Sequence, residues 1–132
     1  MELKKSTRKD KKYMIKHDNK TIHFGAKGMR DYTLMNDKSN KFYEPNKEDR
    51  EKVKKNYQTR HSKDPINTPF TAGSLSYYLL WNKPTLTASI RDYNKRFKTN
   101  IKLSYWINIH NILIQSFIST YFKNFSGEGF SF

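Results

Sequence analysis

Apolar and polar residues alternate most regularly in "YMIKHDNKTIHF", residues 13–24. Asp18 and Asn19, in the middle of this stretch, tolerate left-handed backbone and predict a two-residue turn between two antiparallel strands. The turn fixes the cross-strand pairs, which are His17 with Lys20, Lys16 with Thr21, Ile15 with Ile22, Met14 with His23, and Tyr13 with Phe24. One face of the hairpin is then apolar, and because an isolated hairpin is only marginally stable, that face must pack on other elements.

The segment after residue 45 has the residue types of a surface helix. Asn46 is a suitable N-cap, acidic residues follow it near the positive end of the helix dipole, and the pattern extends to about His61. The apolar face is thin, since it contains little more than Val53 and Tyr57. The basic residues on another face would meet either phosphate or water, and the sequence leaves both interpretations open.

Two buried helices are predicted further along the chain. Residues 69–81 carry no charge and are apolar nearly all round, which predicts a buried helix with Thr68 as its cap. Pro84 then ends this helix, and Thr85 caps the next one over residues 86–97. That last helix has a single apolar stripe, formed by Leu86, Ile90, Tyr93 and Phe97.

The remaining segments complete a small α+β fold. Residues 1–11 have the composition of a flexible basic arm, "GAKG" at residues 25–28 is a plain turn, and residues 29–35 are predicted to be extended or irregular. A basic α+β domain is expected over residues 12–98, with the hairpin packed on two to three helices. Its predicted core consists of Tyr13, Ile15, Ile22, Phe24, Leu75, Leu79, Leu86, Ile90 and Phe97.

Residues 99–132 are predicted to be a hydrophobic extension, which we expect to be helical. Alternating apolar residues up to Ile109 suit a strand, whereas polar residues from Ser104 to Ser119 recur at helical spacing. The uncharged stretch is about as long as a membrane span, but Asn, Gln and His within it are unfavourable in lipid. Packing against the domain or a partner ranks first, contact with a membrane surface second, and a true span third.

The composition adds a strong positive charge to this picture. Of the 132 residues, 26 are Lys or Arg and 12 are Asp or Glu, which gives a formal net charge of +14. Most of the excess lies before residue 64. Such a charge indicates a polyanionic partner, although basic faces also serve solubility alone. Cations interleaved with aromatic rings can hold single strands by phosphate contact and stacking, and the candidate rings are Tyr32, Tyr43, Tyr57 and Trp81. Burial in the core is the competing explanation for most of them.

The sequence contains no recognisable catalytic or metal-binding motif. Cysteine is absent, which excludes disulfides and thiol chemistry and favours an intracellular setting. His17 and His23 would lie on opposite faces of the hairpin, and neither they nor His61 and His110 have the spacing of metal ligands. We therefore expect neither an enzyme nor a bound cofactor.

Three stretches, "IHFGAKGMRDYT", "YQTRH" and "TAGSLSYYLLWNKPTLTASIRDYNKRF", carry a family resemblance. In their order and spacing, residues 12–97 resemble a family of small basic proteins encoded by nucleocytoplasmic large DNA viruses, the giant viruses of amoebae and algae. The chain departs from the family where "SKDPIN" follows His61 in place of a further basic and aromatic run, and where it continues beyond Lys98. The resemblance implies a viral protein made in the cytoplasm or viral factory of an infected cell and packaged in the virion. It implies no catalytic residues.

Charge and resemblance together favour a non-enzymatic, virion-associated protein that binds nucleic acid, DNA first of all, through largely non-specific phosphate contacts. The cations expected to make these contacts are Lys4, Lys5, Arg8, Lys9, Lys27, Arg30, Lys54, Arg60, Arg91, Lys95 and Arg96. The alternative is a capsid or core structural protein. Its basic surface would meet acidic virion proteins, and residues 99–132 would be its docking element.

Overall fold

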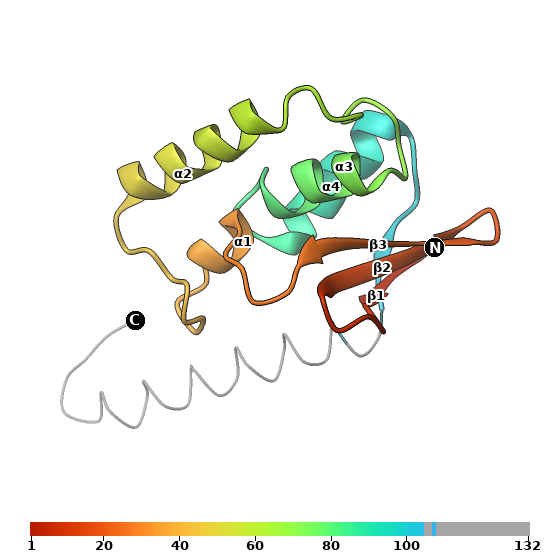
Figure 1. Ribbon diagram of the computed structural model, residues 1–132, viewed down its shortest axis with the longest axis horizontal. Helices are drawn as coiled ribbons and strands as arrows, with labels where there is room; N and C mark the ends of the chain where they lie inside the picture. Colours follow the sequence, from red (N-terminus) through yellow and green to blue (C-terminus); the bar gives the residue numbers. More distant parts are fainter. Residues whose placement is uncertain (105–106, 108–132) are drawn as a thin grey trace.

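The computed structural model describes residues 1–104 and residue 107, and within them the fold is α+β (Figure 1). A four-stranded sheet has the strand order β3-β2-β1-β4. The strands are β1 (Glu2–Lys5), β2 (Lys11–His17), β3 (Lys20–Ala26) and β4 (Lys102–Leu103). The helices are α1 (Tyr32–Met35), α2 (Lys47–Arg60), α3 (Ala72–Leu75), the π-helical η1 (Ser76–Leu80) and α4 (Leu86–Phe97).

The β2–β3 hairpin has the register that the sequence predicts. Asp18 and Asn19 have φ values of 50° and 62°, as a two-residue turn of this kind requires. All the predicted cross-strand pairs are present. Ile15 and Phe24 are buried, and the ring centroids of Tyr13 and Phe24 lie 5.9 Å apart. The prediction of the hairpin is therefore confirmed residue by residue.

The interpretation of residues 1–11 as a flexible arm is wrong, because β1 is an interior strand of the sheet. It pairs antiparallel with β2 and parallel with β4. Leu3 is fully buried, and its backbone lies beside that of Ile15. Leu3 is the only apolar residue of "ELKK", so no local periodicity announces this strand and only its distant partners stabilise it.

The predicted domain boundary at residue 98 is also wrong. The side-chain amide of Asn94 donates a hydrogen bond to the carbonyl of Ile101 and accepts one from its N–H. Ile101 is buried in the core, and the chain then forms β4, which pairs with β1 at the edge of the sheet. The domain therefore includes at least residues 101–103, which the sequence reading assigned to an extension. Apart from its first residues and Ile107, the predicted helical extension lies outside the described part of the chain.

Helices α2 and α4 form where they are predicted. The side chains of Asn46 and Thr85 each accept a hydrogen bond from a backbone N–H in the first turn, at 3.1 Å and 3.2 Å. No residue of α2 is buried, as its thin apolar face predicts, whereas α4 buries Ile90 and Tyr93. The two helices thus differ in role: α4 is part of the core, and α2 lies on the surface.

The helix predicted over residues 69–81 begins later, and its second half is wider. Phe70 has a φ of 60°, which no helix allows, so the helix begins after Thr71 and not after Thr68. The backbone N–H of Phe70 donates a hydrogen bond of 2.9 Å to Tyr93 Oη, which offsets part of the cost of the left-handed conformation. The second half, η1, is a π-helix. This form is rare in proteins, and where it occurs it is often found at a functional site.

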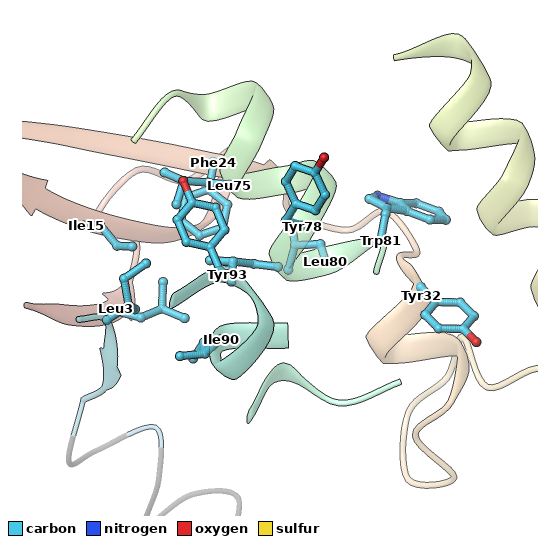
Figure 2. Close-up of a cluster of buried hydrophobic side chains, with 12 residues drawn as sticks. Leu3, Ile15, Phe24, Tyr32, Leu75, Tyr78, Leu80, Trp81, Ile90 and Tyr93 are labelled. Atoms are coloured by element: carbon cyan, nitrogen blue, oxygen red, sulfur yellow. The ribbon is translucent and has the colours of Figure 1, made fainter. Parts of the chain in front are cut away.

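The core lies between one face of the sheet and the helices α3, η1 and α4 (Figure 2). Every predicted core residue either belongs to this buried cluster or packs against it. The cluster also contains seven buried residues that were not in the predicted core: Leu3, Tyr32, Tyr78, Leu80, Trp81, Tyr93 and Ile101. Figure 2 shows Trp81 and Tyr32 away from Leu3 and Ile15, at the end of the core nearest α2.

Gly25 and Gly28 both have positive φ, of 79° and 85°, but only Gly25 lies against the core. A Cβ at Gly25 would lie 2.8 Å from Leu80 Cδ1, whereas a Cβ at Gly28 would have no atom within 4 Å. Gly28→Ala is expected to lower the free energy of unfolding by about 1 kcal/mol, the backbone cost alone. Gly25→Ala also overpacks buried Leu80 and is expected to cost about 1–3 kcal/mol more. Urea denaturation measures the two losses, and equal losses would contradict the close contact between Gly25 and Leu80.

Candidate nucleic-acid interface

A cleft of about 500 Å³ lies between α2 and the open end of the β2–β3 hairpin, opposite its turn. One wall consists of the start of β2, the end of β3 and the loop that continues to Asp31. The opposite wall is α2 with His61, and η1 with Trp81 forms the floor. These segments are far apart in the sequence, so the cleft exists only because the chain folds.

Four cations line this cleft, and three of them, from three different segments, have no carboxylate partner among the described residues. Lys11 begins β2, Arg30 lies in the loop before α1, and Arg60 is the last residue of α2. Arg30 and Arg60 are exposed, and Lys11 is half-buried. Within residues 1–104, none of the three forms an ion pair with a carboxylate. The cleft therefore presents uncompensated positive charge in a concave surface, where the field of several cations adds up.

Among the described residues, Asp31 is the one carboxylate that lines the cleft, and Lys12 neutralises it. Lys12 Nζ lies 2.6 Å from Asp31 Oδ2 and donates a second hydrogen bond of 2.7 Å to the carbonyl of Met29. Asp31 is 1% exposed and also accepts hydrogen bonds from Thr33 Oγ1 and from the N–H of Leu34, so it caps α1. This cap explains why residues 32–35 are helical where irregular chain is predicted, and the ion pair fixes Arg30 beside β2.

A stack of aromatic rings joins α2 to the rest of the fold. Tyr57 stacks on Trp81 with centroids 4.3 Å apart and planes 7° apart, and on His61 with centroids 4.2 Å apart. Gln58 Nε2 donates a hydrogen bond of 3.0 Å to the carbonyl of Trp81, and His61 Nδ1 lies 2.7 Å from Asp64 Oδ2. These contacts hold an otherwise exposed helix at a fixed place above the floor of the cleft.

Tyr57 remains a neutral phenol at neutral pH. Burial is the main cause that raises its pKa to about 12, and the negative charge of Asp64 adds to it, while the charge of Arg60 acts in the opposite direction. A phenol with this pKa is a hydrogen-bond donor and a ring for packing, and it does not supply a negative charge that would oppose an anionic ligand.

Most of the cations predicted from the sequence lie outside the cleft. Lys4 and Lys5 are on β1, Arg8 and Lys9 in the turn before β2, Lys27 in the loop after β3, Lys54 on α2, and Arg91, Lys95 and Arg96 on α4. All of these except Lys54 are exposed. Only Arg30 and Arg60 of the predicted set line the cleft together.

Four of the outlying cations are engaged by the protein itself. Lys4 and Arg8 form exposed ion pairs with Glu2 and Asp10, at 3.8 Å and 3.2 Å, and the other two also contact aromatic rings. Lys54 Nζ lies 4.5 Å from the ring centroid of Tyr32, and the Arg96 guanidinium lies 4.2 Å from that of Tyr78. Each also has a carboxylate within 4.0 Å. Their charge is partly compensated, in contrast to that of the cations in the cleft.

Lys11 lines the cleft but is not among the cations predicted from the sequence, although the hairpin register indicates its position. Continuing the hairpin register outward places Lys11 opposite Ala26, the last residue of β3, where the loop that carries Arg30 begins. The hairpin alone thus brings these two cations to one end of the sheet. The position of Arg60 beside them depends on the docking of α2 and had no such signal.

The aromatic rings proposed for base stacking are largely used within the fold. Tyr32 is 5% exposed and Trp81 is 8% exposed, which supports the alternative that they belong to the core. Tyr57 contacts two other rings, and Tyr43 is half-buried in the loop before α2. Stacking of bases on these rings is therefore not the main source of binding.

The histidines in the described part of the chain have separate environments. His17 stacks on Phe70 at 3.9 Å, and His23 Nδ1 lies 2.7 Å from Ser6 Oγ. Among the residues that the structure describes, no cluster of His, Asp and Glu is suited to hold a metal ion. No helix in residues 1–104 is long and apolar enough to cross a membrane.

Comparison with known proteins gives one similarity. Residues 1–44 are similar to a family of unknown function, DUF5754. This segment contains β1, β2, β3 and α1, together with Lys11, Arg30 and the Lys12–Asp31 pair. No curated protein and no solved structure is significantly similar to the chain.

Proposed function

We propose that this protein binds nucleic acid without catalysing a reaction, mainly through contacts between its cations and phosphates. The observation that carries this proposal is the convergence of Lys11, Arg30 and Arg60 on one cleft without carboxylate partners among the described residues. Phosphates satisfy such cations because binding releases condensed counterions from the nucleic acid. The exposed cations on β1, on the β1–β2 turn and on α4 extend the same interaction over the surface. DNA is the nucleic acid that we propose first.

The cleft is the part of this surface that best distinguishes phosphate binding from mere solubility. Cations that serve solubility are dispersed in open solvent, where each is hydrated by itself. In the cleft, the Lys12–Asp31 pair fixes the backbone next to Arg30, and the Tyr57–Trp81 stack fixes the helix that carries Arg60. The backbone positions of both arginines are therefore set before any ligand arrives. Such preorganisation lowers the entropic cost of binding.

Replacing Arg30 and Arg60 together with alanine is expected to weaken binding to a short DNA strand about tenfold at moderate salt. Each lost phosphate contact also lowers the steepness of the salt dependence, so the slope of log K against log salt should decrease by about 1.5 in magnitude. Fluorescence anisotropy of a labelled strand, measured over a series of salt concentrations, gives both quantities.

A matched control removes the same charge elsewhere. Lys38 and Lys83 are exposed and do not line the cleft, so Lys38→Ala with Lys83→Ala should leave most of the affinity and of the salt slope unchanged. If the two double variants lose affinity equally, only net charge matters and the cleft has no special part. If the unaltered protein does not bind DNA even at low salt, phosphate binding itself is refuted.

The setting that we propose follows from the resemblance to proteins of giant viruses. It suggests action in the cytoplasm or viral factory of an infected cell, and packaging with other virion proteins. The alternative of a capsid or core structural protein depends on docking by residues 99–132, of which all but the first few and Ile107 lie outside the described residues. In the salt series above, the absence of DNA binding would refute the phosphate proposal and leave this structural alternative in its place.

A further inference from the structure

The cleft offers an apolar surface as well as positive charge. Met29, at its rim, is 61% exposed, the most exposed large apolar side chain of the described residues. Val53 and the buried Leu80 and Trp81 lie deeper in the same cleft. Met29 directly precedes Arg30 in the chain, and the flexible thioether of methionine suits packing against a flat ring. The ligand that matches the cleft is therefore anionic at one end and apolar and planar at the other.

We propose that the cleft receives one nucleotide unit of a single-stranded nucleic acid. This inference rests on the proposed function and specifies which form of nucleic acid the cleft accepts. The phosphate would contact Lys11, Arg30 and Arg60, and the base would lie against Met29 and Val53. Asn56 also lines the cleft, and its amide provides a donor and an acceptor for the edge of the base.

The size of the cleft favours a single strand over a duplex. A volume of about 500 Å³ lies in the range of pockets that enclose small molecules, and it is enclosed on opposite sides by α2 and the hairpin. A duplex presents its phosphates on a wide convex surface and keeps its bases stacked inside. A single strand can turn one base out of its stack, and every base has a flat face that an apolar wall can contact.

The η1 helix supplies the residues that form the floor of this site. Ser76, Leu80 and Trp81 all line the cleft and lie at the start, at the end and just after the π-helical turn. Gly25 brings the hairpin backbone close to Leu80, which closes the floor from the other side. An insertion of this kind in an otherwise ordinary helix often marks a functional site, and here it borders the same cleft as the uncompensated cations.

The first test uses a substitution that narrows the cleft without changing its charge. Ala26 is an exposed residue of β3 that lines the cleft, and Thr21 is an exposed residue of the same strand that does not. Ala26→Leu is expected to weaken binding of a labelled oligo-dT strand about tenfold, the loss of one base contact, and to leave binding of a duplex of mixed sequence unchanged. Thr21→Leu should change neither, and thermal unfolding shows whether each variant is folded.

Met29→Ser is the second variant, because this exposed side chain has little effect on folding. It should lower the affinity for oligo-dT severalfold and leave the affinity for the duplex unchanged. The inference is overturned if both cleft variants bind oligo-dT like the unaltered protein, or if they weaken both forms of DNA by the same factor. In those cases phosphate binding would still stand. Failure of the unaltered protein to bind either form at low salt would instead refute the proposed function.

Discussion

Lys12→Met is expected to lower the free energy of unfolding by about 3–5 kcal/mol, because it leaves a buried carboxylate without its cation. The side chains of Lys12 and Asp31 are only 12% and 2% exposed, and their charged atoms lie 2.6 Å apart. Methionine also loses the hydrogen bond from Lys12 Nζ to the carbonyl of Met29. Urea denaturation followed by circular dichroism measures the loss.

Lys16→Met provides the matched control, since Lys16 is an exposed lysine on the same strand. It should change the stability by less than about 0.5 kcal/mol. A double variant, Lys12→Met with Asp31→Asn, should recover more than half of the loss, because asparagine removes the unpaired charge and still accepts the hydrogen bond that caps α1. Equal losses for Lys12→Met and Lys16→Met would contradict a structural role for the ion pair.

Leu3→Ala is expected to lower the free energy of unfolding by about 2–5 kcal/mol, although Leu3 lies near the very start of a lysine-rich segment. Leu3 is 0% exposed and belongs to the central cluster, between β2 on one side and β4 on the other. Truncation leaves a cavity where two strands meet that are distant in sequence. The same urea denaturation measures this effect.

Lys5→Ala, two residues further along β1, removes an exposed side chain and should cost about 0.5 kcal/mol or less. The comparison separates a strand from a flexible arm, since an arm would tolerate both changes equally. If Leu3→Ala unfolds at the same urea concentration as Lys5→Ala, residues 2–5 do not form the interior strand described above.

The residues that local rules describe well are those whose partners lie nearby in the chain. Asp18 and Asn19 determine a turn, the turn determines the register, and the apolar face of the hairpin follows. Asn46 and Thr85 cap helices at the places that their residue type predicts. Where the backbone departs from its ordinary preferences, as at Phe70, local rules place the start of the helix wrongly.

Such local rules do not predict the strands β1 and β4. Each is short, each has a single apolar residue that is at least partly buried, and their parallel pairing joins residues near 2 and near 102. A pairing of that kind is stabilised only after the rest of the sheet and the core exist, so no window of the sequence contains its signal.

For the candidate site, the sequence by itself determined the chemistry: an excess of cations, no cysteine, and a hairpin that brings Lys11 and the loop of Arg30 to one end of the sheet. Only the tertiary structure decided which cations act together. The Tyr57–Trp81 stack docks α2 so that Arg60 lines the same cleft as Arg30, while Lys54 and Arg96 are engaged by rings and carboxylates of the protein. The physical reason is that charge is a property of each residue, whereas the field that a phosphate meets depends on distances between residues that only packing fixes.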